Sequence, residues 1–502
     1  MVILIFCIQP LFVARGRYFT LTWDKFIFFV ICMCCVLIAT IIIWIVRFLG
    51  EPALGPRERL GIADLAILGF AFVTILSAMF SPVRHAVNVW IGLTDPVGRY
   101  DGAITQLLYV AAFLITAHWY KPRTLHFIIF GVSASLVALI GILQFFGVDF
   151  LKLWPIDNPE YYIENYYNII FRTTLGNVDF VSTFTCIAIM LSGFLFVKMK
   201  SKWRPLWIAA SALNFWLMKL AGADSGRVGV LVATLLVLPF IVENLKTLGN
   251  TLILGSSWLA AYTLQKLIFD VIIMKSKTFP SLLPFILAVV ALIAAGIILS
   301  KKGKEPPRDA PVKWKLGLIL LALCLAAGIA GVEVIGKRDA ERDAYTGGAG
   351  VVVGTGVIYE LREIMHGRMQ DDFMTNRAYI WRNALEAYPR FPVIGTGPDT
   401  FPYAFPNEAH GRYAEAYDKA HNEYIQILIC QGILGLFCYL AFLGAVVFKA
   451  APKAFRNPLL LPLLAALIGY CAQAFFNISN PIVSQMLWVL AGMLVNKRVR
   501  KA

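Results

Sequence analysis

The stretch FIFFVICMCCVLIATIIIWIVRFL, residues 26–49, contains one charged side chain, Arg47, close to its end. A helix needs about 20 apolar residues to cross the hydrocarbon core of a bilayer, so this stretch is long enough to span a membrane. The whole chain has the same character: of its 502 residues, 59% are hydrophobic and 15% are charged, against about 25% charged in soluble domains. We therefore predict an integral membrane protein and exclude a soluble enzyme, a disulfide-rich secreted scaffold and a disordered linker.

Apolar runs bounded by charge, proline and glycine predict an all-α membrane fold with 12–14 transmembrane helices, 14 being the best count. The first run is interrupted by Gln9-Pro10 and has no basic residues before it, so we interpret it as a weak, retained helix and not as a signal peptide. The nine cysteines all fall within the predicted spans, which indicates neither a disulfide framework nor a zinc site. The predicted spans are residues 1–14, 26–49, 62–80, 103–119, 124–147, 177–197, 205–220, 226–241, 252–274, 281–299, 316–336, 423–448, 458–476 and 482–495.

The basic residues predict how the spans are oriented. The connections on one side contain 23 lysines and arginines, the short loops opposite contain 11, and the richer side is expected to be cytoplasmic. Both termini are then cytoplasmic, and the long polar segment 337–421 lies on the outer face. This organisation comprises eleven spans in 1–336, an outer loop in 337–421, and three spans with a basic tail in 422–502. Topology thus explains the formal charge of +15, and no nucleic-acid partner is expected.

Three arginines lie at the outer ends of predicted spans. Arg227 occurs in ADSGRVG, residues 223–229, where the eighth span begins. One interpretation is a capped helix start with an arginine that reaches outward to water. The other is a phosphate site, because a helix N-terminus and a guanidinium both bind anions. Arg99 and Arg172 occupy the equivalent ends of the fourth and sixth spans, so the three side chains could converge on one anion.

The outer loop holds two further candidates. Residues 375–388 have the periodicity of a helix that carries Arg377, and the segment FPVIGTGP at 391–398 predicts a turn whose glycines permit close backbone approach. His421 opens the twelfth span, which soon reaches Gly432-Ile433-Leu434-Gly435, small residues that let helices pack tightly. A histidine in this position is either a structural hydrogen-bonding residue or a catalytic base, and the residues alone leave both open.

Arg377 followed by WRNAL at 381–385, the turn at 392–397, and HNEY at 421–424 before the glycines resemble the signature of the O-antigen ligase and O-antigen polymerase superfamily. Their order and spacing match as well, and SGR at 225–227 and LGN at 175–177 resemble earlier motifs of the family. The resemblance covers most of the chain past residue 95. It implies a GT-C-like membrane glycosyltransferase in the cytoplasmic (inner) membrane of a bacterium. Its active site would lie on the extracytoplasmic face, with part of it carried by the outer loop 337–421.

The resemblance also implies the substrates. The donor would be a polyprenyl-diphosphate-linked glycan. The acceptor hydroxyl would belong to a lipid-anchored core oligosaccharide, a second growing glycan or a protein, and the sequence does not separate these three. A lipid-borne donor is also expected on chemical grounds, since nucleotide sugars are absent outside the cytoplasm.

The same resemblance suggests a role for each site residue. His421 is the general base, with Glu423 and His410 as the next candidates, while Arg377 and Arg227 stabilise the departing diphosphate. Arg99 and Arg172 join them in substrate binding. A one-step displacement of this kind inverts the anomeric centre, and we expect no metal or other cofactor.

A polytopic transporter or a lipid-linked-glycan flippase is the alternative, because about fourteen helices also suit those folds. A flippase is expected to have several deep charges and short outer loops, whereas here the largest polar segment lies outside. Two superposable halves in the structure would favour transport.

The orientation is testable by labelling Ala409→Cys, in an otherwise cysteine-free chain, with a membrane-impermeant thiol reagent. Labelling in intact cells is expected, because the positive-inside count places segment 337–421 outside. Labelling that occurs only after lysis would reverse the orientation.

Overall fold

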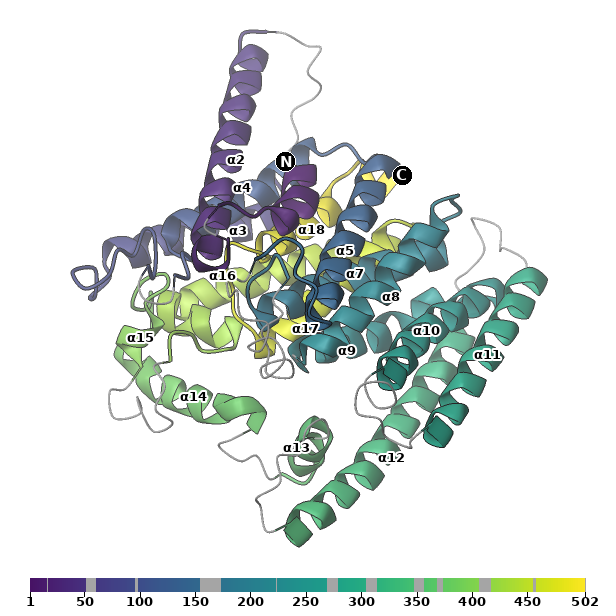
Figure 1. The fold of residues 1–502 in the computed structure, drawn as a ribbon. Coiled ribbons are helices and arrows are strands. Elements are labelled where there is room, and N and C mark those ends of the chain that lie inside the picture. The colour runs from purple at the N-terminus through teal and green to yellow at the C-terminus, as the bar shows by residue number, and fades with distance from the viewer. Residues whose placement is uncertain are drawn as a thin grey trace.

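The computed structural model describes residues 1–15, 17–50, 60–94, 98–153, 173–222, 224–268, 279–303, 314–346, 356–367, 373–405, 417–454 and 457–501, and the regular elements in these ranges are all helices (Figure 1). The all-α membrane fold predicted from composition is therefore confirmed.

Within the described ranges, eight helices are long and apolar enough to cross a bilayer. They are α2 (Arg17–Phe48), α3 (Ile62–Met79), α5 (Thr124–Phe145), α7 (Val178–Lys198), α9 (Asp224–Ile241), α11 (Phe279–Lys302), α12 (Trp314–Thr346) and α16 (Glu423–Ala454). Three shorter apolar helices and two less apolar ones pack among them: α4 (Ala103–Trp119), α17 (Leu460–Gln473), α18 (Gln485–Val495), α8 (Arg204–Ala221) and α10 (Leu245–Lys266).

Helix α7 forms the centre of the bundle. It packs against α8, α9 and α17, and every residue of its most apolar window is buried (Figure 1). Helices α2, α11 and α12 lie at the periphery, and α12 buries only 6% of its window. Such peripheral helices expose apolar side chains all round, which is stable where the surroundings are lipid. Residues at the ends of α7 are therefore carried by a helix that the bundle encloses.

The predicted first span, 1–14, is helical over ten of its fourteen residues in the structure. Residues 1–14 contain a π-helical turn, Leu4–Ile8, followed by α1 (Gln9–Leu11). The ten helical residues, 2–11, rise about 15 Å, too little to cross a hydrocarbon core. The Gln9 side chain donates to the carbonyl of Pro481 at 2.6 Å, so this helix packs against the protein interior.

Helix α12 extends to Thr346, ten residues beyond the predicted end of that span at 336. The added segment, KRDAERDAYT, is rich in Ala, Glu, Arg and Lys and has no proline or glycine before Gly347. These residues favour helix, so the polarity that ends the membrane span does not end the helix.

Helix α16 is kinked at Gly432, whose φ of +69° and ψ of −174° are not helical. The predicted turn at 391–398 lies against this kink: Gly397 N–H donates to Cys430 O at 2.8 Å, and Ile433 N–H donates to Pro392 O at 2.9 Å. A Cβ on Gly432 would lie 2.2 Å from Val393 O, so only glycine allows the contact. The close approach predicted from the glycines is confirmed, and the turn satisfies backbone groups that the kink leaves free.

In its described residues, the outer loop predicted from the sequence contributes three short α-helices at one end of the bundle: α13 (Gly356–Met365), α14 (Phe373–Ala387) and α15 (Phe401–Ala404) (Figure 1). We call this the loop end. Helix α14 confirms the predicted helix at 375–388. Its Trp381 indole N–H donates to Ala420 O at 3.0 Å, which attaches the helix to the segment that leads into α16.

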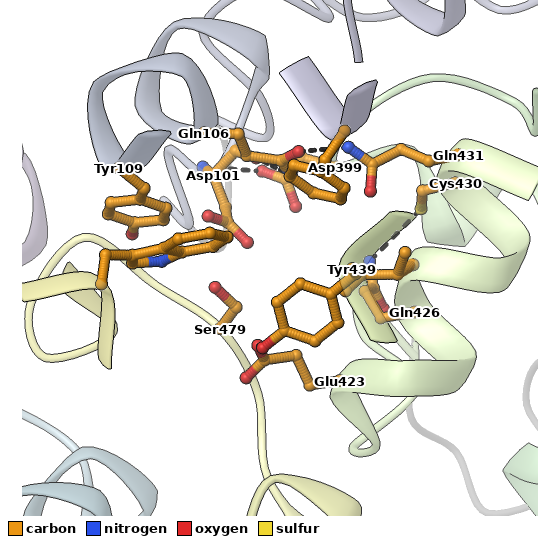
Figure 2. Close-up of a pocket in the computed structure, with 13 residues that line it drawn as sticks. Asp101, Gln106, Tyr109, Asp399, Glu423, Gln426, Cys430, Gln431, Tyr439 and Ser479 are labelled. Carbon is orange, nitrogen blue, oxygen red and sulfur yellow. Dashed lines mark hydrogen bonds between the residues drawn. The ribbon is translucent and has the colours of Figure 1, made fainter. Parts of the chain in front are cut away.

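A buried ion triad fastens that segment to the bundle. The Lys419 ammonium lies 2.7 Å from Asp399 Oδ1 and 3.2 Å from Asp101 Oδ2, and its side chain is 1% exposed. The other oxygen of Asp399 accepts from the backbone N–H groups of Leu93 at 2.8 Å and Asp101 at 3.1 Å. Figure 2 shows Asp101 and Asp399 side by side. The triad joins the start of α4, the residues after the glycine turn and the start of α16.

Lys419→Met should destabilise the protein by about 3–5 kcal/mol, because it leaves two buried carboxylates without their counter-charge. Thermal unfolding of the detergent-purified protein measures the effect. Lys453→Met replaces an exposed lysine in α16 and should leave the melting temperature unchanged. Equal melting temperatures for the two variants would contradict the role assigned to the triad.

Candidate active site

His421 lies directly before the first turn of α16. The following residue, Asn422, caps the helix: its side-chain oxygen accepts from the N–H groups of Tyr424 and Ile425 at 3.0 and 3.1 Å. His421 itself has a φ of +48°, a conformation that is uncommon for residues other than glycine. Because Ala420 is held by Trp381 and His421 is followed by a capped helix start, the imidazole is attached to rigid structure on both sides.

Four charged side chains surround His421. Its Nδ1 lies 3.8 Å from Asp179 Oδ2, and the second oxygen of Asp179 lies 3.8 Å from the Arg377 guanidinium. Arg99 forms an ion pair with Asp418, three residues before the histidine. We call Arg99, Asp179, Arg377, Asp418 and His421 the arginine–histidine cluster. It combines residues from the start of α4, the first turn of α7, helix α14 and the segment before α16.

Burial lowers the pKa of His421, and the nearby guanidinium groups of Arg377 and Arg99 act in the same direction. Asp179 and Asp418 oppose this shift without reversing it. The imidazole is therefore neutral at pH 7, because its ordinary pKa is already about 6.5. Neutral imidazole is the form that can accept a proton.

Asp418 stays ionised despite its burial. Burial alone raises the pKa of a carboxyl group, but the ion pair with Arg99, with smaller contributions from His421 and Lys419, brings the pKa of Asp418 below its ordinary value. Arg99 is thereby held beside the histidine.

Arg227 lies in the first turn of α9, with its guanidinium 2.5 Å from Asp224 and 3.4 Å from the carbonyl oxygen of Lys219. The Asp224 carboxylate is close enough to Arg377 to act on it electrostatically. Asp224 therefore interacts with both Arg227 and Arg377, and this links Arg227 to the cluster. Arg172, the fourth predicted arginine, and His410 lie outside the described residues.

The sequence interpretation missed three contributors, Asp179, Asp418 and Asn477. Asp179 follows the predicted motif at 175–177 and begins a buried span, which is the one signal that could have found it. Asn477 comes from the non-helical, buried segment between α17 and α18, and its amide donates to the backbone oxygen of Asp179 at 2.9 Å. Irregular backbone is tolerated here because protein encloses it.

Glu423, the alternative base, points away from the cluster. Its two carboxylate oxygens accept from the hydroxyl groups of Tyr439 at 2.5 Å and Tyr470 at 2.9 Å. Figure 2 shows Glu423 beside Tyr439 in a small internal pocket, which Asp101 and Ser479 also line. This geometry favours His421 over Glu423 as the group that meets a substrate.

Comparison with known proteins bears on what the cluster does. The family model described as O-antigen ligase matches residues 280–440. The match includes Arg377 and His421 and confirms the resemblance over this part of the chain, while the motifs at 175–177 and 225–227 lie outside it. Among curated proteins, none matches the chain. The match covers about a third of the chain, and together with the eight apolar helices of the described ranges it indicates a multi-pass membrane protein with a region similar to the O-antigen ligase family.

Proposed function

We propose that this protein is an inverting glycosyltransferase that moves an oligosaccharide from a polyprenyl-diphosphate-linked donor to an acceptor hydroxyl at the outer face of the cytoplasmic membrane. The observation that carries the proposal is the placement of His421 and Arg377 on the two oxygens of one carboxylate, Asp179, with the Arg99–Asp418 pair beside the histidine, at the loop end. A base beside cationic groups suits a displacement in which the nucleophile loses a proton and the leaving group gains negative charge.

In the proposed reaction, His421 Nε2 takes the proton from the acceptor hydroxyl while that oxygen attacks the anomeric carbon of the donor. The bond between the anomeric carbon and the diphosphate oxygen breaks, and the diphosphate leaves with the bonding electron pair. Arg377 and Arg227 stabilise the charge on the departing oxygens. Each well-placed donor of this kind is worth about 2.7–4 kcal/mol in the transition state, so the proposed mechanism uses no metal.

Arg99 and Arg172 complete the proposed binding set. Arg99 approaches the site from the side of α4, where its ion pair with Asp418 holds it beside His421. The proposal leaves the acceptor open among a lipid-anchored core oligosaccharide, a growing glycan and a protein hydroxyl.

The direct test mixes the purified protein with a synthetic polyprenyl-diphosphate oligosaccharide and each of the three acceptor classes in turn. Transfer of the glycan to one of them, with release of the polyprenyl diphosphate, is expected. Absence of transfer to every class, together with movement of the intact donor across vesicle membranes, would favour the flippase alternative.

Arg377→Ala and Arg227→Ala should each lower kcat by about 10²–10³, because each removes a cationic donor that meets the diphosphate in the transition state. Lysine should restore only part of the loss, since it lacks the two-pronged geometry of guanidinium. Arg390→Ala alters an exposed arginine of the same loop and serves as the control. Full activity in both test variants at normal expression would refute the arginine clamp.

His421→Ala should lower turnover by about 10² or more while donor binding is retained, because only the proton transfer is lost. The activity of the parent should be constant near neutral pH and decline only below about pH 6.5, since burial lowers the pKa of His421 and only the neutral imidazole accepts a proton. Steady-state rates between pH 5 and pH 8 measure both effects. His366→Ala, which changes a histidine with 41% of its side chain exposed, is the matched control. Normal turnover in a well-folded His421→Ala protein would exclude this base.

A further inference from the structure

Asp179 is the residue common to the proposed base and the proposed leaving-group site. Its two oxygens are divided between them, one 3.8 Å from His421 Nδ1 and the other 3.8 Å from Arg377. The side chain is 14% exposed. It extends from the first turn of α7, whose most apolar window is completely buried.

The backbone around Asp179 is held from two directions. Asn177 caps α7, with its side-chain oxygen accepting from the N–H of Asp179 at 2.8 Å, and Asn477 donates to the Asp179 carbonyl oxygen at 2.9 Å. These bonds hold the Asp179 carboxylate in place. Arg377 and His421, which both belong to segment 337–421, are positioned against it.

The Nδ1 nitrogen of His421 can take Asp179 as its hydrogen-bond partner. This nitrogen is buried and has no hydrogen-bond partner within 3.5 Å, and Asp179 Oδ2 lies only slightly farther away. Hydrogen bonds of a catalytic base are often long without substrate and shorten when substrate binds. The charged groups that face the ring are Asp179 from α7, Arg377 from α14, Arg99 from before α4 and Asp418 from its own segment. Asp418 is already paired with Arg99, which leaves Asp179 as the carboxylate at Nδ1.

We propose that Asp179 is the positioning residue of His421: its carboxylate keeps the ring proton on Nδ1, leaves the Nε2 lone pair for the acceptor hydroxyl, and stabilises the imidazolium formed during transfer. This inference rests on the proposed function, in which His421 is the base. The tautomer of a histidine is set by the partner of its other nitrogen, so loss of the carboxylate removes the correct form.

Asp179→Asn is the decisive variant, because the amide keeps the size of the side chain and removes its charge. Its kcat, with the acceptor that supports transfer, should fall about 10²–10⁴-fold without a rise in the KM for the donor. A side chain that only supported the helix would lower expression or melting temperature and leave kcat unchanged. Asp179→Glu, which retains the charge, should recover part of the loss.

A second readout does not depend on activity. Diethyl pyrocarbonate modifies neutral imidazole, and His421 has 27% of its side chain exposed, so the pH midpoint of its modification, followed by mass spectrometry, reports its pKa. In Asp179→Asn this midpoint should move to lower pH, because Asp179 favours the protonated ring. Asp64→Asn is the matched control: Asp64 also lies in a helix first turn and contacts a histidine, His118, at 3.0 Å, in α3 and α4. It should change neither kcat nor the His421 midpoint.

The outcomes separate the two proposals. Parental kcat and an unmoved midpoint in Asp179→Asn, with an inactive His421→Ala, would overturn the role of Asp179 and leave the proposed function standing. Parental kcat in both variants would overturn the base as well. If Asp179→Asn is too unstable to purify, the midpoint is measured in membrane vesicles with Asp179→Ser, and an unmoved midpoint there overturns the role of Asp179.

Discussion

Lys419 neutralises two aspartates where water is excluded, and the position of the candidate site depends on that ion triad. Removing ions from water costs several kcal/mol each, so a buried lysine is stable only where its partners are correctly placed. Asp399 and Asp101 belong to segments about 300 residues apart in the chain, and both contact the same ammonium group. Asp418 and His421 flank Lys419, so the geometry that satisfies the lysine also fixes where the cluster forms.

Much of the fold could be predicted from the sequence because a bilayer imposes a strong constraint on it. Every spanning segment needs a long apolar run, and such runs are legible without any knowledge of packing. The helix that carries Arg377 and the turn at 391–398 were also predictable, since periodicity and glycine act over a few residues. The first span was predicted too long, because apolar composition alone does not distinguish a short, protein-packed helix from a spanning one.

The site was only partly predictable, and the reason is the distance over which its residues meet. Arg99, Arg377 and His421 are conspicuous as ionisable residues near predicted span ends. Asp179 is not, because an acidic residue in the first turn of a helix is ordinary and is explained by the helix dipole alone. Lys419 has the appearance of a solvated loop lysine, and only the structure shows that it is enclosed.

The arginines and aspartates of the proposed site balance one another's charge. The described arginines of the proposed site each have an acidic neighbour: Arg99 has Asp418, Arg227 has Asp224, and Arg377 faces Asp179. Such pairing makes a group of buried guanidinium ions tolerable without a ligand, since unpaired buried charges are costly. Under the proposed function the same pairing has a chemical consequence. A bound diphosphate competes with the aspartates for the guanidinium groups, and an aspartate that gives up its arginine becomes a stronger partner for an imidazolium. Asp179 is the carboxylate placed between an arginine and the histidine, so its two oxygens provide the shortest physical connection between donor binding and proton transfer.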